Sequence, residues 1–283
     1  MTRDLESKTF VVTGANTGIG KITAQELARR GAHVIIACRS RAKAEPVIAE
    51  IKAETGNSNI ELVELDLSDL SSVRHCAEEL LARKIPIHGL INNAGLAGKR
   101  GLTKDGFELA FGTNHLGHYL FTRLLLDRIK ESGHARIVNV SSASHYQAKG
   151  IDWSALHEPT KSVTGLREYE VSKLANVLFT KELARRLDGS GVTTYAVHPG
   201  VVASDAWRRV PQPFRWLMKL FMVTTEQGAR SSLRCATDPE LETETGRYYT
   251  DDGREKKPSK LADDVELQSN LWSRSAEWTG LPA

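Results

Sequence analysis

The sequence has few cysteines, no long apolar run and no block of like charge. Its three cysteines, Cys38, Cys76 and Cys235, stand far apart and form no CxxC pair. This spacing argues against a zinc site and a disulfide framework, and it fits a reducing compartment. Lysine and arginine exceed aspartate and glutamate by only three, 38 against 35, and no charged run marks a nucleic-acid-binding tail. Nucleic acid is therefore not an expected partner.

Apolar targeting signals are also missing from the sequence. The first ten residues, MTRDLESKTF, lack the apolar core of a signal peptide, and no later stretch approaches the length of a membrane span. We therefore expect a cytoplasmic protein without a transmembrane anchor. The 283 residues, 40% of them hydrophobic, suffice for one full core. A single domain over 1–283 is the default expectation for an α/β chain of this length.

Apolar runs alternate with segments of helical periodicity along the chain. Continuous runs predict strands that are buried on both faces, at 9–14, 32–38, 60–66, 87–95, 136–142 and 192–200. Between them, as in ITAQELARR, a long segment around 107–130 and VSKLANVLFTKELARRL, apolar residues recur at three- and four-residue spacing. This order predicts an α/β fold, a doubly wound parallel sheet with helices on both faces and ligands beyond the strands' carboxyl ends. We expect 201–225 and the tail after 250 to be irregular.

A glycine-rich turn, TGANTGIG at 13–20, joins the first predicted strand to the first helix. Glycine permits positive φ and lets a ligand approach the backbone closely, and the N–H groups at a helix N-terminus favour a phosphate. Gly14, Gly18 and Gly20 therefore indicate a dinucleotide pyrophosphate site. Their GxxxGxG spacing differs from the GxGxxG fingerprint. Only the other motifs decide between this site and a turn that merely packs tightly.

Four further motifs end predicted strands or begin predicted helices, so they converge on one rim of the sheet. They are NNAG at 92–95, SS at 141–142, YEVSK at 169–173 and HPG at 198–200. Together with the glycine turn, these motifs resemble the short-chain dehydrogenase/reductase family over nearly the whole chain. The resemblance implies a Rossmann-type domain that uses a nicotinamide cofactor to interconvert an alcohol and an aldehyde or ketone.

A closer likeness concerns one branch of that family. The stretches ACR, NHLGH, HPGVV and EQGARSSL, with the glycine turn, resemble the retinol dehydrogenase-like branch. That likeness implies retinoids or other lipophilic carbonyls as substrates, generally with NADP(H). Membrane-bound relatives carry an apolar N-terminal anchor, whereas this chain enters its first predicted strand within ten residues. Retinol itself is therefore left open as the substrate.

The YEVSK motif suggests acid–base chemistry. Tyr169 and Lys173 lie about 6 Å apart along one helix face, and a nearby ammonium is expected to lower a tyrosine pKa from about 10. Tyr169 is then the expected general acid or base toward the substrate oxygen, and Ser142 is expected to hold that oxygen. The resemblance assigns this role to Ser142, the second serine of the pair. Strand alternation directs Ser141 to the opposite face.

The NHLGH segment contributes one further expected catalytic residue. In the resembled family, an asparagine after NNAG supports a water that links the lysine to solvent, and here this residue is Asn114. The neighbouring His115 and His118 have no carboxylate or cysteine partner at ligand spacing, which makes a metal site a poor interpretation. We expect both histidines to be packing or surface residues.

The end of the second predicted strand, ACRSRAK, bears on the choice of cofactor. An acidic residue there would bind the ribose 2′-hydroxyl of NAD, whereas Arg39, near Arg41 and Lys43, suits a 2′-phosphate. We therefore expect NADP(H) rather than NAD(H). The resemblance implies that Asp66 contacts the adenine and Val202 the nicotinamide carboxamide. The expected cofactor-binding residues are Gly14, Asn16, Thr17, Gly18, Ile19, Gly20, Arg39, Asp66, Leu67, Asn93, Ala94, Gly95, Tyr169, Lys173, Pro199, Gly200, Val202 and Ser204.

The segment 207–222, WRRVPQPFRWLMKLFM, offers a clue to the substrate. Phe214, Leu217 and Phe221 fall on one helical stripe, and the resembled family covers its substrate with this region. A substrate-covering segment at 201–225 would favour a small lipophilic aldehyde, ketone or alcohol. Burial in the core, a contact between subunits of a homo-oligomer and weak attachment to a membrane surface remain open alternatives.

Two other functions compete with a dehydrogenase. A non-catalytic NADP-binding sensor would keep the glycines and Arg39 but would not need Asn114, Ser142, Tyr169 and Lys173 together. A nucleotide-sugar epimerase would share the glycine turn and the tyrosine–lysine pair. Epimerases, however, use another glycine spacing and carry a larger substrate domain. The sequence favours the dehydrogenase over both.

Overall fold

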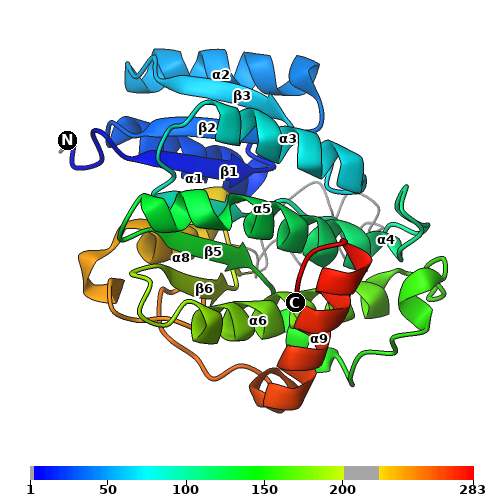
Figure 1. Ribbon diagram of the computed structural model, residues 1–283. Helices are drawn as coiled ribbons and strands as arrows, with labels where there is room; N and C mark the ends of the chain where they lie inside the picture. Colours follow the sequence, from blue (N-terminus) through cyan, green and yellow to red (C-terminus); the bar gives the residue numbers. More distant parts are fainter. Residues whose placement is uncertain (1–2, 201–222) are drawn as a thin grey trace.

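A parallel sheet forms the centre of the computed structural model, which describes residues 3–200 and 223–283. Within these ranges the sheet has seven strands in the order β3-β2-β1-β4-β5-β6-β7, and every neighbouring pair is parallel (Figure 1). The strands are β1 (Thr9–Thr13), β2 (His33–Cys38), β3 (Ile60–Glu64), β4 (Gly89–Asn92), β5 (Arg136–Val140), β6 (Thr193–Val197) and β7 (Arg247–Tyr249). All their carboxyl ends therefore meet at one edge of the sheet.

Helices cover both faces of the sheet (Figure 1). One face carries α1 (Gly18–Arg29), α2 (Arg41–Thr55) and α8 (Thr225–Thr237), and the other carries α3 (Leu70–Ala82), α5 (Gly117–Glu131) and α6 (Leu166–Arg186). Successive strand side chains alternate, so Val11 joins the core beneath α3 and α5 while Val12 joins the core beneath α1. Burial on both faces explains the continuous apolar runs and confirms the predicted doubly wound fold.

The helix expected around 107–130 forms in three consecutive parts. A short α4 (Leu109–Phe111) leads into one π-helical turn, η1 (Gly112–Leu116), which continues into α5. A π turn was not expected from the sequence, and such turns are frequent at functional sites. The remaining short elements are the 3₁₀ helices η2 (Ala143–Gln147), η3 (Ala155–His157), η5 (Pro239–Leu241) and η6 (Lys260–Asp263).

The C-terminal part of the chain corrects one sequence prediction. The tail after 250, expected to be irregular, contains α9 (Val265–Trp278), which packs on α6 (Figure 1). The Asp264 carboxylate accepts the Leu267 N–H at 2.9 Å and caps this helix. Two guanidinium groups lie over the Trp272 ring, that of Arg123 at 4.6 Å and that of Arg186 at 4.3 Å from its centre. Burial of this aromatic side chain against α5 and α6 therefore holds the tail in a helix.

Two further findings bear on the C-terminal third. The three-residue β7 pairs with β6, although no apolar run predicted it, because so short an edge strand carries too few residues for a periodic pattern. Val202, Ser204 and the apolar stripe Phe214, Leu217 and Phe221 lie outside the described residues. In the described ranges, no helix is both long and apolar enough to cross a membrane.

Candidate active site

The three glycines of the first turn are required for different reasons. Gly14 has φ +68°, and a Cβ there would lie 2.9 Å from the Cα of Ala94. Gly18 has φ +56°, and a Cβ there would meet no atom within 4 Å, so this backbone borders open space. A Cβ on Gly20 would lie 2.7 Å from the Gly14 carbonyl oxygen. Since α1 begins at Gly18 and Thr17 makes no side-chain cap, its first N–H groups are left for a ligand.

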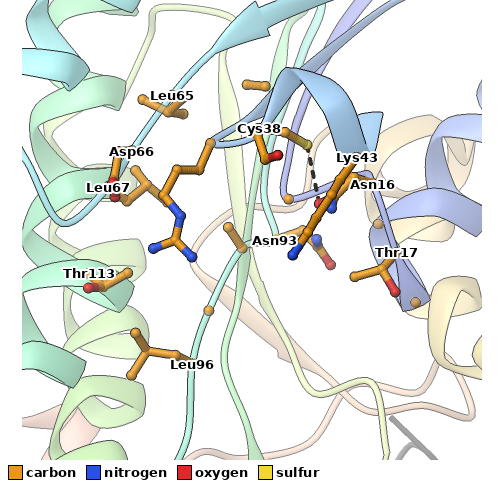
Figure 2. Close-up of a pocket in the computed structure, with 18 of the residues that line it drawn as sticks. Asn16, Thr17, Cys38, Lys43, Leu65, Asp66, Leu67, Asn93, Leu96 and Thr113 are labelled. Atoms are coloured by element: carbon orange, nitrogen blue, oxygen red, sulfur yellow. Dashed lines mark hydrogen bonds between the residues drawn. The ribbon is translucent and has the colours of Figure 1, made fainter. Parts of the chain in front are cut away.

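A cavity of about 400 Å³ opens beyond this turn, at the carboxyl ends of β1 to β4. In the view of Figure 2, Asp66 and Leu67 lie on one side of the cavity, Asn16 and Thr17 on the other, and Asn93 between them. The expected cofactor residues that line this cavity are Gly14, Asn16, Thr17, Gly18, Ile19, Gly20, Arg39, Asp66, Leu67, Asn93, Ala94 and Gly95. The structure thus brings these expected residues together from four separate segments of the sequence.

Basic residues at this cavity separate into two groups. Arg39 is exposed and lines the cavity, as does Lys43 on the first turn of α2. Arg41 instead pairs with Glu64 at 2.8 Å and with Glu45 at 3.6 Å. Lys43 was not among the expected cofactor residues, although its place four residues after Arg39 was a usable signal. Arg39 and Lys43 therefore give one end of the cavity a positive charge.

A second cavity of about 330 Å³ continues from the first. The two cavities share Ile19, Asn93, Gly95 and Leu96 as lining residues. The second is lined in addition by the expected residues Ser142, Tyr169, Lys173, Pro199 and Gly200, and by Ala97, Ser144, Leu166 and His198, which the sequence analysis did not assign. Most of its lining surface is apolar. A ligand that fills the first cavity can therefore reach the tyrosine and lysine of α6.

Tyr169 and Lys173 lie on the same face of α6, with the ammonium nitrogen of Lys173 5.5 Å from the centre of the Tyr169 ring. Lys173 is buried, and its Nζ donates to the Val140 carbonyl at 2.9 Å. Burial lowers the pKa of Lys173 to about 8. Burial also raises the pKa of Tyr169, an effect that the Ser142 hydroxyl partly offsets.

The raised pKa of Tyr169 is opposite to the direction expected from its lysine neighbour. The spacing of the pair was right, but the expectation left out the loss of hydration that both groups undergo in the folded protein. Burial disfavours the phenolate, and it also weakens the positive charge that would stabilise that phenolate. Without a ligand, the phenol form of Tyr169 is therefore the stable one at neutral pH.

The two serines after β5 have different surroundings. The Ser141 hydroxyl is buried and donates to the backbone carbonyl of Lys173 at 2.7 Å. Ser142 lines the second cavity, and its hydroxyl accepts the Ser144 N–H and donates to the Ser144 hydroxyl, both at 3.2 Å. Only the Ser142 hydroxyl is therefore held beside Tyr169 by bonds that a substrate oxygen could replace.

Asn114 lies in the π turn η1 and is fully buried. Its side chain accepts the Leu96 N–H at 2.8 Å and donates to the Leu96 carbonyl at 2.9 Å and the Ser172 hydroxyl at 3.0 Å. A Cβ on Gly95 would lie 3.3 Å from the Asn114 Oδ1 and 3.4 Å from the Lys173 Nζ. Asn114 therefore fixes the loop of Gly95 and Leu96 that lines both cavities, next to the lysine.

The two neighbouring histidines are buried and neutral. Burial lowers the pKa of His115 to about 3 and that of His118 to about 4. His115 contacts the Ser275 hydroxyl on α9 at 3.1 Å. No group of three or more potential metal ligands occurs in the described part of the chain. Both histidines thus lie in the packed interior, where only hydrogen bonds are available to them.

Comparison with known proteins agrees with this geometry. The family described as short chain dehydrogenase matches residues 8–213. The chain belongs to the short chain dehydrogenases. It is 48% identical to retinol dehydrogenase 12 of Mus musculus over 98% of this chain and 88% of that protein. It is 47% identical to retinol dehydrogenase 11 of Homo sapiens over 99% of this chain and 88% of that protein.

A solved structure supports the same assignment. An uncharacterized protein from Mycobacterium paratuberculosis is 35% identical, covers 100% of this chain and 99% of its own, and superposes with a TM-score of 0.77. The identity to the two retinol dehydrogenases confirms the resemblance to the retinol dehydrogenase-like branch. This short chain dehydrogenase is an oxidoreductase that acts on CH–OH groups with a nicotinamide cofactor.

Proposed function

We propose that this chain is an NADP(H)-dependent oxidoreductase that interconverts a lipophilic alcohol and its aldehyde or ketone, with Tyr169 as general acid and base. The observation that carries the proposal is the continuity of the two cavities. One has the glycine turn and a basic end, and the other contains Ser142, Tyr169 and Lys173. The residues that would hold a cofactor thus line a cavity that adjoins the one lined by the residues that would move a proton.

The first cavity fits a dinucleotide that carries a 2′-phosphate. Gly18 borders open space at the N-terminus of α1, where the pyrophosphate would bind, and Asp66, after β3, would contact the adenine. Arg39 and Lys43 line the part of the cavity next to the carboxyl end of β2. The lining residues from the β2–α2 turn include no acidic residue. A guanidinium can bind two phosphate oxygens in one plane, which favours NADP(H).

The residues of the second cavity divide the chemistry among them. A nicotinamide bound by these residues would supply or accept the hydride, and its oxidised ring would carry a positive charge. In reduction, Tyr169 gives its hydroxyl proton to the carbonyl oxygen, and its raised pKa keeps that proton available. In oxidation, the Tyr169 phenolate takes the alcohol proton, and the Lys173 ammonium stabilises that phenolate. Ser142 donates to the same substrate oxygen once its hydroxyl turns from Ser144.

A lipophilic substrate is supported by the apolar lining and by the relatives. Leu96, Ala97 and Leu166 form apolar wall at the second cavity, and Leu166 is 43% exposed there. An apolar side chain at the mouth of a cavity favours an apolar ligand. We extend to this chain the substrate class that the name retinol dehydrogenase gives to its relatives. The segment 201–225 is proposed to cover this substrate within a single domain over 1–283.

The variant Tyr169→Phe tests this function. It removes only the hydroxyl, so turnover of retinol, retinal or another lipophilic substrate should fall by about 10²–10⁴-fold. Binding of NADPH, followed by fluorescence titration, should remain near the native value because the ring and the helix are unchanged. Near-native turnover in a variant shown to be folded by its thermal transition would contradict the role of Tyr169.

A further inference from the structure

His118, which the proposed chemistry does not use, joins the two halves of the site through its two ring nitrogens. It lies in the first turn of α5 and is 2% exposed. Nδ1 lies 2.9 Å from the Asn114 carbonyl oxygen, and Nε2 lies 2.9 Å from the Thr13 hydroxyl oxygen. Because a carbonyl oxygen only accepts, Nδ1 carries the hydrogen of the neutral ring and Nε2 accepts the hydroxyl proton of Thr13. Both contacts fix one tautomer and one ring orientation.

On the Thr13 side, His118 leads to the cofactor cavity. The Thr13 hydroxyl oxygen accepts the N–H groups of Asn93 and Ala94, both at 2.9 Å. The Thr13 carbonyl accepts the Asn93 side-chain amide at 2.8 Å. Asn93 and Ala94 line the first cavity, and Ala94 lies against Gly14. By accepting a hydrogen bond from the Thr13 hydroxyl, Nε2 of His118 directs the lone pairs of that oxygen toward these two N–H groups.

On the Asn114 side, His118 leads to the second cavity. Its Nδ1–H binds the carbonyl of the residue at the middle of the π turn, where helical hydrogen bonding is altered. The Asn114 side chain in turn holds both backbone groups of Leu96, next to Gly95 and the Lys173 ammonium. The orientation of the π turn therefore sets the position of the loop beside Lys173.

We propose that His118 is a positioning residue that acts separately on cofactor binding, through Thr13, and on turnover, through Asn114. It touches neither cavity, so it is not catalytic. The predicted effect on turnover rests on the proposed function. The predicted effect on binding requires only that the folded chain binds NADPH. Asparagine and glutamine at this position can each keep one of the two contacts. The asparagine amide reaches the position of Nδ1, and the glutamine amide reaches that of Nε2.

The test measures the NADPH dissociation constant and kcat for each variant. His118→Asn keeps the donor to Asn114, so its NADPH dissociation constant should rise about three- to tenfold while kcat stays within about twofold. His118→Gln keeps a partner for Thr13, so kcat should fall about three- to tenfold while the dissociation constant stays within about twofold. His88→Gln, at a half-buried histidine just before β4 whose Nδ1 accepts the Thr9 N–H at 3.0 Å, is the matched control and should change neither value.

Thr13→Val gives an independent arm should a His118 variant fail to fold. It should weaken NADPH binding at least as much as His118→Asn does, and the double variant should show less than the product of the two effects, because both variants remove the bond between His118 and Thr13. Equal changes in the dissociation constant and kcat in the Asn and Gln variants, or native values in both, would overturn the positioning role. Native protein that binds NADPH but turns over no alcohol or carbonyl would instead refute the proposed function, leaving the predicted effect on binding to decide on His118.

Discussion

At the scale of one residue, Lys173 is a buried charge that stability alone would not favour. Its side chain is 3% exposed, and within the described ranges its ammonium donates to the Val140 carbonyl without a carboxylate beside it. Burial is the cause that lowers its pKa to about 8. A buried, uncompensated charge disfavours the folded state, and such groups concentrate at functional sites. The proposed role in stabilising the Tyr169 phenolate gives a reason to keep it.

Replacing this lysine should separate stability from activity. Lys173→Met removes the buried charge, so the cofactor-free variant should unfold at the native temperature or above, while turnover is lost and NADPH binding weakens. The unfolded lysine has a pKa of about 10.4, so the unfolded chain binds more protons than the folded chain between pH 8 and that value. The native free energy of unfolding should therefore gain from Lys173 as pH rises through this window, and the variant should lack that gain. Denaturant titration of the native protein and of Lys173→Met at several pH values measures this difference. A marked loss of stability in the variant would contradict the prediction.

At the scale of one element, α3 illustrates how a helix begins at this edge of the sheet. Asp69 is the residue before its first turn, and its Oδ1 accepts the Ser71 N–H at 3.0 Å and the Ser72 N–H at 3.3 Å. Its other carboxylate oxygen accepts the Lys104 ammonium at 2.5 Å. The Lys104 contact, followed by the contact with Ser71, lowers the pKa of Asp69 to about 2. A cap and an ion pair thus act on one carboxylate.

Two substitutions distinguish the cap from the ion pair. Asp69→Ala loses both and should lower the free energy of unfolding by about 1–2 kcal/mol. Asp69→Asn keeps an oxygen for the two N–H groups, and the exposed lysine contributes little, so its loss should be below about 1 kcal/mol. Because the folded pKa is depressed, the native contribution is present above about pH 4 and is lost as pH falls toward 2. Urea unfolding at pH 7 measures both variants, and equal losses would assign the effect to the ion pair.

At the scale of the whole molecule, the two cavities connect segments from both halves of the sheet. The first is lined from residues after β1, β2, β3 and β4, and the second from residues after β4, β5 and β6. A ligand that binds only the folded chain stabilises it by about 2.7 kcal/mol when its concentration is 100 times its dissociation constant. Cofactor preference can therefore be read from the unfolding temperature of the entire chain.

We expect NADPH to raise the unfolding temperature more than NADH at equal concentration. A charged contact to the 2′-phosphate contributes about 1.5–3 kcal/mol, which is one to two decades of affinity. Arg39→Ala should reduce the difference between the two cofactors. Arg41→Ala is the matched control, since its guanidinium pairs with Glu64, and it should leave the difference intact. Equal stabilisation of the native protein by NADH would refute the assignment of Arg39.

The sequence by itself determined the features that depend on neighbours along the chain. Continuous apolar runs predicted six strands, and four-residue spacing placed Tyr169 and Lys173 on one helix face. The glycine turn, NNAG and YEVSK follow strands or begin helices, so their convergence at one edge followed from the parallel order. The roles of the site residues and a cytoplasmic location stay predictions.

Only the tertiary structure decided the features that depend on partners distant in sequence. Burial reversed the expected direction of the Tyr169 pKa, because desolvation is set by the packing around α6 rather than by the residue four positions away. The helix α9 forms where Trp272 meets α5 and α6, and β7 forms where an edge of β6 is open to pair. His118 acquires its partners from β1 and η1, 105 residues and four residues away. Hydrogen bonds and desolvation depend on which groups are close in space, so the order of residues along the chain did not predict them.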